Sequence, residues 1–464
     1  MPETTAKRKT LRSLLGKSAV RFSALNLPLA SLLLSVAGAR SGRLRRLTAT
    51  LRPRTQEDGN ILYLYVDIAF QGVVAGAGAA YLSVFAVRLG ASTFLVGLLA
   101  SVPALILTLL SLPAGRFVAK QPRLVPVIVR CGSAFNAAYL LVALASWLLP
   151  RYAPQAVVVI WALASVALAF SSVAFVAALG EAVPPSRRGN VISIRYAIHA
   201  CVAAVTLQIT GRVLTWVPFP LNYQVVFLAS FLAGTGSIWI IRKMRLPEQR
   251  PPAPALAIGS TSQRWRAAFV ALRLQAPFFR YLTSSSVFRL GMSLPNALYS
   301  VFWVKHLHLS DGTIALAIAL NYGSNVFGYY LWNKVAKRKG RAWVLAASCL
   351  GVATYPLLTG LARSSLLILI VSVIGGLFGA GMTVSFMDVL LATAPAEQRS
   401  SYVALDSAVG NGTAFLGPLL GSLLANSLGI RIALFMGFAV RVLGVGLFAV
   451  SRVGDRAERT QPGG

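Results

Sequence analysis

The stretch PPSRRGN at residues 184–190 opens a long apolar run, and PAEQRSS at residues 395–401 opens another. Arg188 and Arg399 hold the same place in these two stretches and lie 211 residues apart. Each stretch combines a proline turn with an arginine. A proline turn followed by an arginine therefore separates apolar segments in both parts of the chain.

Two further pairs of stretches repeat at nearly the same offset. AKQPR at residues 119–123 closes one apolar run, and KRKGR at residues 337–341 closes another 218 residues later. FAVR at residues 85–88 is echoed by FWVK at residues 302–305, at an offset of 217. Repeats that keep their offset within a few residues indicate a duplicated chain, and six apolar stretches in each unit are typical of a membrane transporter.

The composition predicts a membrane protein. Only 12% of the 464 residues are charged and 56% are hydrophobic, whereas a soluble domain carries about 25% charged residues. A helix of about 20 apolar residues crosses the hydrocarbon core. Twelve such segments are present: 61–87, 92–115, 125–149, 154–179, 191–215, 222–241, 281–304, 313–335, 342–361, 366–391, 402–427 and 431–451. We therefore expect an all-α membrane protein with twelve transmembrane helices in two pseudo-symmetric six-helix bundles.

The formal charge of +32 follows the predicted topology. With the N-terminus inside, 34 of the 44 Lys and Arg fall in cytoplasmic segments or, for Lys334, at the inner end of a span, and six lie in outer segments or, for Arg212 and Arg431, at the outer end of a span. This asymmetry follows the positive-inside rule and predicts that both termini are cytoplasmic. We expect the protein in the cytoplasmic (inner) membrane. It predicts anionic lipids as partners and argues against nucleic acid. The three cysteines lie singly, without metal or redox spacing, so we expect no cofactor.

The predicted domains follow the two groups of spans. They are a basic cytoplasmic tail (1–60), an N-terminal six-helix bundle (61–242), a cytoplasmic linker with an amphipathic helix (243–280), a C-terminal six-helix bundle (281–452) and a short cytoplasmic tail (453–464). An apolar stretch at residues 22–39 lies within the first tail between arginines. A signal peptide and a thirteenth span remain alternatives there to an interfacial or disordered segment.

The loops after the second and eighth spans carry the residues of a family resemblance. Over residues 61–452 the chain resembles the major facilitator superfamily, whose motif in these loops is Gly, three residues, Asp, a basic residue, any residue, Gly and then basic residues. The positions that match are Gly115, Lys120 and Arg123 in the first loop and Arg338, Gly340 and Arg341 in the second.

The same loops depart from the family pattern at the acidic position. Ala119 and Lys337 stand where the family has Asp, Pro122 replaces the second glycine of the first loop, and Asn333 replaces the first glycine of the second. In the family this acid helps to latch the cytoplasmic side of the outward-facing state. The resemblance therefore implies that such a latch is weaker here or is built from other residues.

The fifth span bears on the kind of transporter. Drug–proton antiporters of the superfamily usually carry a Gly-Pro signature there, and TLQITG at residues 206–211 does not match it. A GPLLG run occurs instead at residues 417–421, in the eleventh span, where small residues favour close helix packing. These features argue against a typical drug antiporter. The stretch EAVPPSRRGN (181–190) is similar to the junction of the fourth and fifth spans in poorly characterised bacterial members.

Ionisable residues inside the spans are the candidates for transport chemistry, because each costs roughly 3 kcal/mol or more without a partner or water. Asp67 shares a face of the first span with Gln71. Arg289 lies at about the same depth in the seventh span, and the resemblance implies that the first and seventh spans line the central path. Asp67 is thus predicted as a proton or cation site, with Arg289 as an anion anchor or counter-charge. The alternative is a permanent ion pair between the halves.

A second set of ionisable residues is predicted near the inner face. Arg195 and Asp406 each follow the duplicated arginine by seven residues, so opposite charges occupy equivalent depths. They are candidates for a cytoplasmic gate. In the alternative interpretation each pairs locally, Arg195 with Glu181. His199 lies one turn after Arg195 and is a further candidate for proton transfer.

Together these features predict a secondary active transporter that moves a small solute by alternating access and is coupled to protons. We expect it to be a monomer, and we do not expect it to be an enzyme. A facilitative permease is the first alternative. A membrane-embedded transferase and a non-transporting sensor or scaffold are further ones. The printed sequence has no Gly-x4-Gly-Lys-Ser/Thr loop, which argues against direct ATP drive. The short predicted outer loops carry one acid, Asp311, which argues against catalysis.

Overall fold

The architecture is taken from a computed structural model, which describes residues 55–246, 276–393 and 399–451. Residues 63–464 form one compact unit, and residues 1–62 belong to another. The expected amphipathic helix and most of both predicted tails lie outside the described residues. The predicted domain boundaries stay predictions.

The described residues are almost entirely helical, as expected for segments that must satisfy their backbone hydrogen bonds within lipid. In the first half the helices are α4 (Gln56–Val74), the π-helical η1 (Ala75–Ala79), α5 (Ala80–Arg88), α6 (Thr93–Ala119), α7 (Leu124–Leu148), η2 (Pro150–Tyr152), α8 (Ala153–Ala182), α9 (Pro185–Trp216) and α10 (Leu221–Ile241). In the second they are α12 (Ala276–Ser293), α13 (Asn296–Val301), η3 (Phe302–His306), α14 (Asp311–Lys339), α15 (Arg341–Leu361), α16 (Ser365–Thr393), α17 (Arg399–Leu428) and α18 (Ile430–Ser451).

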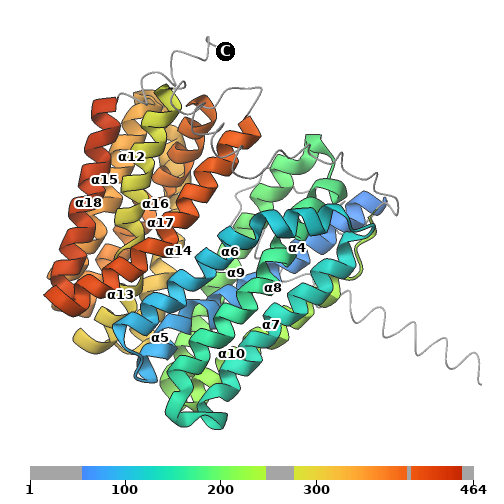
Figure 1. Ribbon diagram of the computed structural model, residues 1–464, viewed down its shortest axis with the longest axis horizontal. Helices are drawn as coiled ribbons and strands as arrows, with labels where there is room; N and C mark the ends of the chain where they lie inside the picture. The colour runs from blue at the N-terminus through green and yellow to red at the C-terminus, as the bar shows by residue number, and fades with distance from the viewer. Residues whose placement is uncertain (1–54, 247–275, 394–398, 452–464) are drawn as a thin grey trace, which may run out of the picture. The chain divides into compact units, whose positions relative to one another are not determined.

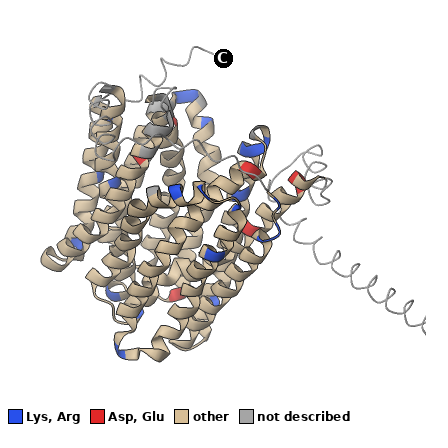
Figure 2. Ribbon diagram, turned by 45° about the vertical axis from the view of Figure 1, so that its right-hand side comes forward, with Lys and Arg blue, Asp and Glu red and all other residues tan. Residues whose placement is uncertain are grey.

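Each predicted span coincides, to within one residue at its ends, with part of one of these helices or of one broken run of them, and the twelve-helix architecture is confirmed. Within the described residues, ten helices are long and apolar enough to cross a membrane. The seventh and eighth predicted spans, in α12–η3 and α14, are not among these ten. Figure 2 shows charged residues as scattered marks on helices that are otherwise uncharged.

The helices form two bundles, seen in Figure 1 as a blue-to-green group (α4–α10) and a yellow-to-red group (α12–α18). Contacts between the bundles run mainly through the pairs α6–α17 and α9–α14. Small residues allow these approaches: a Cβ added to Gly97 would meet Ser422 of α17, and one added to Gly211 would meet Ala315 of α14. Close packing of small residues is how helices associate in lipid, where the hydrophobic effect does not drive them together.

Among the prolines in the helices of the C-terminal bundle, which include Pro418 inside α17, two share one compensating arginine. Pro295 lies between α12 and α13, and Pro356 lies inside α15. A proline has no N–H, so the carbonyl four residues earlier loses its helical donor. Those carbonyls belong to Gly291 and Val352. The Arg441 side chain of α18 donates to both, from Nε at 3.0 Å and from Nη1 at 2.7 Å.

The remaining hydrogen bonds of Arg441 also go to residues next to the break in the seventh span. Its Nη2 donates to the carbonyl of Met292 at 3.4 Å and reaches the Tyr299 hydroxyl at 3.2 Å. Arg441 is 3% exposed, so its guanidinium is buried among backbone carbonyls. Arg441 thus holds the broken seventh span against α15 and α18.

Candidate functional site

A set of polar contacts joins the two bundles where α5 ends and α14 begins. Arg88, the last residue of α5, donates from Nη2 to the carbonyl of Leu309 at 2.8 Å and to Asp311 Oδ1 at 3.0 Å. Lys305, in η3, donates to the carbonyl of Ala91 at 2.8 Å. We call these five residues the clasp.

The clasp is reciprocal. Arg88 and Lys305 are the basic ends of the duplicated FAVR and FWVK stretches. Each donates to the other bundle, at a carbonyl that directly precedes a serine N-cap: Ser310 accepts from the Thr313 N–H and Ser92 accepts from the Leu95 N–H, both at 3.2 Å. Each half of the chain therefore donates a hydrogen bond from a basic side chain to a backbone carbonyl of the other half.

The reciprocity ends at one residue. Asp311 gives Arg88 a carboxylate partner, and the side chains are 30% and 10% exposed, for Arg88 and Asp311 respectively. The position equivalent to Asp311, 218 residues earlier, is Thr93. Lys305 therefore relies on a carbonyl where Arg88 has both a carbonyl and an ion pair.

Away from the clasp, the N-terminal bundle buries an ion pair between its first and fifth helices. Asp67 of α4 is 3% exposed and Arg195 of α9 is 8% exposed. Arg195 Nη2 lies 3.3 Å from Asp67 Oδ2, and its Nη1 donates to the carbonyl of Leu64 at 2.9 Å. The guanidinium also covers the ring of Phe175 on α8, 4.9 Å from its centroid. We call Asp67 and Arg195 the N pair.

A short hydrogen-bond chain leads to the N pair. Ser237 of α10 donates to Asp67 Oδ1 at 2.6 Å, and Gln71 donates to the Ser237 hydroxyl at 2.9 Å. Gln71 is exposed, whereas Ser237 is buried. The chain links an exposed amide to a buried carboxylate, and both oxygens of that carboxylate accept a hydrogen bond.

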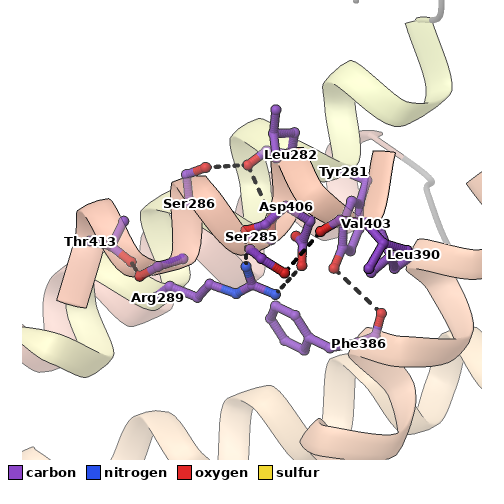
Figure 3. A network of polar contacts seen from close by, with 12 residues as sticks. Tyr281, Leu282, Ser285, Ser286, Arg289, Phe386, Leu390, Val403, Asp406 and Thr413 are labelled. Carbon is purple, nitrogen blue, oxygen red and sulfur yellow. Dashed lines mark hydrogen bonds and ion pairs between the residues drawn. The ribbon is translucent and has the colours of Figure 1, made fainter. Parts of the chain in front are cut away.

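The C-terminal bundle holds a corresponding pair between its own first and fifth helices, α12 and α17. Arg289 Nη2 lies 2.9 Å from Asp406 Oδ2, and its Nη1 donates to the backbone carbonyl of Asp406 at 3.0 Å (Figure 3). The guanidinium lies over the ring of Phe386 on α16, 5.4 Å from its centroid. We call Arg289 and Asp406 the C pair.

The two pairs share one plan with the charges exchanged. Arg195 and Asp406 differ by 211 residues, and Phe175 and Phe386 differ by the same 211. In each bundle an arginine–carboxylate pair ties the first helix to the fifth, and the arginine covers a phenylalanine of the fourth. In the N pair the arginine stands on the fifth helix. In the C pair it stands on the first.

This arrangement differs from the pairings expected from sequence. Asp67 and Arg289 were predicted to meet across the halves, but each has a partner in its own bundle. Arg195 contacts Asp67 instead of the predicted Glu181, which is exposed near the end of α8. The sequence indicated that Asp67 and Arg289 lie at similar depths in their spans. It did not indicate which neighbouring helix supplies the counter-charge of each.

His199 and Arg188 occupy distinct places on α9. His199 lies one turn beyond Arg195 and is half-buried. Arg188 donates to the carbonyls of Gly180 at 2.7 Å and Val183 at 3.3 Å, which closes the C-terminal end of α8. Lys and Arg commonly satisfy the last carbonyls of a helix, so the duplicated arginine at this junction has a capping role in the first half.

The fold is that of several solved transporters. A bacterial homologue of the iron transporter ferroportin in its inward-facing state is similar with a TM-score of 0.66 and 13% identity, over 85% of this chain and 98% of that one. A structure of the nucleoside transporter NupG gives a TM-score of 0.62 and 12% identity, over 86% and 99%. The family model of the Major Facilitator Superfamily matches residues 281–464.

Residues 281–464 are thus similar to the major facilitator superfamily, and the solved transporters share the fold of the chain. A shorter stretch of 113 residues is 37% identical to the multidrug resistance protein MdtG of Enterobacter lignolyticus and 35% identical to MdtG of Escherichia coli. The matched stretch covers 24% of this chain and about a quarter (27%) of the length of these curated relatives.

The superfamily loop motifs take different forms in the two halves. Gly340 adopts φ +84° between α14 and α15, and its N–H donates to the carbonyl of Ala336 at 3.1 Å. This left-handed conformation favours glycine at the end of a helix. Gly115 lies inside α6 with nothing within 4 Å of an added Cβ. Lys120, Arg123 and Arg338 are not buried.

Proposed function

We propose that the protein is a secondary transporter that moves a small organic solute across the cytoplasmic membrane by alternating access, driven by the proton gradient. The clasp is the observation that carries the proposal. It joins the two bundles through three side chains at one end of the spans, and opening there would break these hydrogen bonds together with the apolar contacts between the bundles. The positive-inside asymmetry supports placing this end outside.

In this interpretation the described state is closed outside. The ion pairs recorded toward the other end of the spans lie within bundles, so they leave each bundle free to move as a body. The inward-facing state of the ferroportin homologue, whose fold is similar, supports the same assignment. Rocking of the two bundles would then break the clasp and expose the central path to the outside.

Asp67 and Asp406 are the carboxylates that proton coupling would use. Both are buried, and a buried charge inside a span is a functional candidate by default. Arg195 and Glu181 remain proposed gate residues, and Gln71, Arg289 and His199 remain proposed participants in coupling. The likeness of 113 residues to MdtG supports including drugs in the search for a solute, although the drug-antiporter signature of the fifth span is absent.

An uncoupled permease is the second candidate function. Its support is the complete bonding of Asp67, which fits a permanent structural ion pair as well as a titrating site. A permease would use the same clasp and the same rocking motion without exchanging a proton.

Proteoliposomes with an imposed pH gradient distinguish these functions. Purified protein is reconstituted and a panel of organic anions, sugars, nucleosides and lipophilic cations is tested for uptake and release. We expect flux that rises with the gradient and is reduced to downhill exchange in Asp67→Asn or Asp406→Asn. Flux that ignores the gradient would favour the permease. Absence of flux for the whole panel, in liposomes whose protein keeps its fold, would contradict transport.

A further inference from the structure

One exposed face of α14 changes from apolar to basic toward the C-terminal end of the helix. Phe327 and Tyr330 are 63% and 72% exposed, and Lys334 and Arg338 are exposed as well. Steps of three, four and four residues place these four side chains on the same face of the helix. We call these four residues the α14 stripe.

The length of α14 sets the depth of the stripe in the membrane. The helix begins at Asp311 in the clasp and rises about 1.5 Å per residue, so Phe327 lies about 24 Å and Arg338 about 41 Å along it. The hydrocarbon core is about 30 Å thick, and the headgroup layers extend the membrane to about 40–45 Å. With Asp311 at one membrane boundary, Phe327 lies beside acyl chains of the opposite leaflet, the inner one in the predicted topology. Lys334 and Arg338 then lie in the headgroup layer of that leaflet.

The two cations of the stripe have no carboxylate partner among the residues that the structure describes. Asp388, the acid that α16 carries toward the same end, pairs with neither of them. Like charges four residues apart destabilise a helix. The sequence adds Lys337 and Arg341 to the same stretch, which increases the local positive charge. An anion from outside the chain would relieve this repulsion.

Lys339 lies next to Arg338 in the sequence but has different surroundings. Its Nζ lies 4.3 Å from the centroid of the Trp343 ring, which lies 6.4 Å from the ring of Trp332. Trp332 is buried, and its Nε1 donates to the carbonyl of Leu377 at 2.8 Å. Lys339 thus covers the face of an aromatic ring, as cations commonly do. The two cations of the stripe have no such ring among the described residues.

The stripe has the chemistry that recognises an anionic phospholipid. The phosphate of such a lipid accepts charge-assisted hydrogen bonds from Lys and Arg, and its acyl chains cover apolar side chains. A free anion would neutralise Lys334 and Arg338 but would leave Phe327 and Tyr330 uncovered. A zwitterionic lipid would cover the two rings but brings a cation of its own to the basic end.

We propose that the α14 stripe binds an anionic phospholipid, with the phosphate between Lys334 and Arg338 and an acyl chain along Phe327 and Tyr330. Binding makes and breaks no covalent bond. The site is specific, in contrast to the general attraction that the positive charge of the chain exerts on anionic membranes. It does not depend on the proposed transport function, since a lipid can occupy the stripe whether or not a solute moves.

Native mass spectrometry of the delipidated full-length protein in detergent tests the site, with phosphatidylglycerol as the probe. We expect saturable binding that is tighter than that of phosphatidylcholine. Arg338→Gln should weaken it about fivefold, and Lys334→Gln combined with Arg338→Gln about 25-fold. Lys339→Gln is the matched control, because it removes the same charge one residue away on another face. It should change the affinity less than about twofold. Size-exclusion profiles check that each variant is folded.

Photo-crosslinking in a bilayer locates the lipid without a measurement of affinity. A benzoylphenylalanine in place of Tyr330 is irradiated in nanodiscs that contain phosphatidylglycerol and phosphatidylcholine in equal amounts, and mass spectrometry identifies the attached lipid. We expect phosphatidylglycerol in excess of its share. The excess should disappear when Lys334 and Arg338 are both replaced by glutamine.

Three results would overturn the proposal. Equal weakening by Arg338→Gln and Lys339→Gln would show attraction by charge alone. Displacement of phosphatidylglycerol by millimolar inorganic phosphate would show a site for a free anion. Cross-links that follow the lipid composition of the nanodisc would show that position 330 contacts lipid without selecting it.

Discussion

Arg195 and Asp406 occupy the same position in the two halves of the chain, 211 residues apart, and carry opposite charges. Each finds its counter-charge on the first helix of its own bundle. Exchange of the two charges conserves the ion pair, whereas a change at one position alone would leave a buried charge unpaired. The two bundles thus keep one architecture with reversed polarity.

The N pair predicts a marked asymmetry between single and double substitutions. Arg195→Gln should destabilise the protein by about 3–5 kcal/mol, since it leaves Asp67 buried without a counter-charge. Asp67→Asn with Arg195→Gln should cost less than the sum of the two single changes. Thermal unfolding in detergent, followed by circular dichroism, measures all three variants. Additive losses would show that the two residues do not interact.

Much of this architecture could be predicted from the sequence, because a run of twenty apolar residues identifies a span without reference to its neighbours. The break at Pro295 was missed although the proline was a visible signal, since the apolar run continues on both sides. The π-helical turn at 75–79 has no comparable signal. The partners of Asp67 and Arg289 were missed for another reason: sequence gives the depth of a residue in its span, but not the helix that its side chain faces.

The clasp predicts a change in the distance between the bundles. Asp311→Asn removes the ion pair of Arg88, and a hydrogen bond to a charged group contributes about 1.5–3 kcal/mol. That is enough to shift a two-state population by about tenfold or more. Spin labels at Arg151 and Arg363, which are exposed and lie in the two equivalent predicted outer loops, should report a longer distance by pulsed electron resonance.

The control for this measurement is Asp388→Asn, which removes an acid of α16 that lies outside the clasp. It should leave the distance between the labels unchanged. The three cysteines at 131, 201 and 349 are replaced beforehand so that only the introduced ones are labelled. An unchanged distance in Asp311→Asn would mean that the clasp does not hold the bundles together.

Thr93 permits a prediction of opposite sign. Thr93→Asp places a carboxylate at the position equivalent to Asp311, next to Lys305 by the reciprocity of the clasp. The added ion pair should strengthen the clasp and partly reverse the effect of Asp311→Asn in the double variant. With the same spin labels, the long-distance population should decrease. An increase would show that the equivalence of the two positions does not extend to their side chains.

The stability lost on replacing Arg441 should depend on whether Pro356 is present. Arg441→Met should lower stability, because the carbonyls of Gly291 and Val352 are left without donors in an apolar bundle. Pro356→Ala restores a backbone N–H four residues after Val352. Arg441→Met should therefore cost less in a Pro356→Ala background, by about 1 kcal/mol or more for the recovered hydrogen bond. Equal losses in both backgrounds, measured by thermal unfolding, would contradict this role.

The reciprocity of the clasp bears on the origin of the chain. Arg88 and Lys305 reach the backbone of the opposite half, at Leu309 and Ala91, and a carbonyl is present whatever side chain the residue carries. The loops were thus free to diverge without loss of the contact. Two separate and identical copies of one half, related by a twofold axis, would make this contact twice. The single chain thus contains the contact that a twofold-symmetric pair of such halves would make.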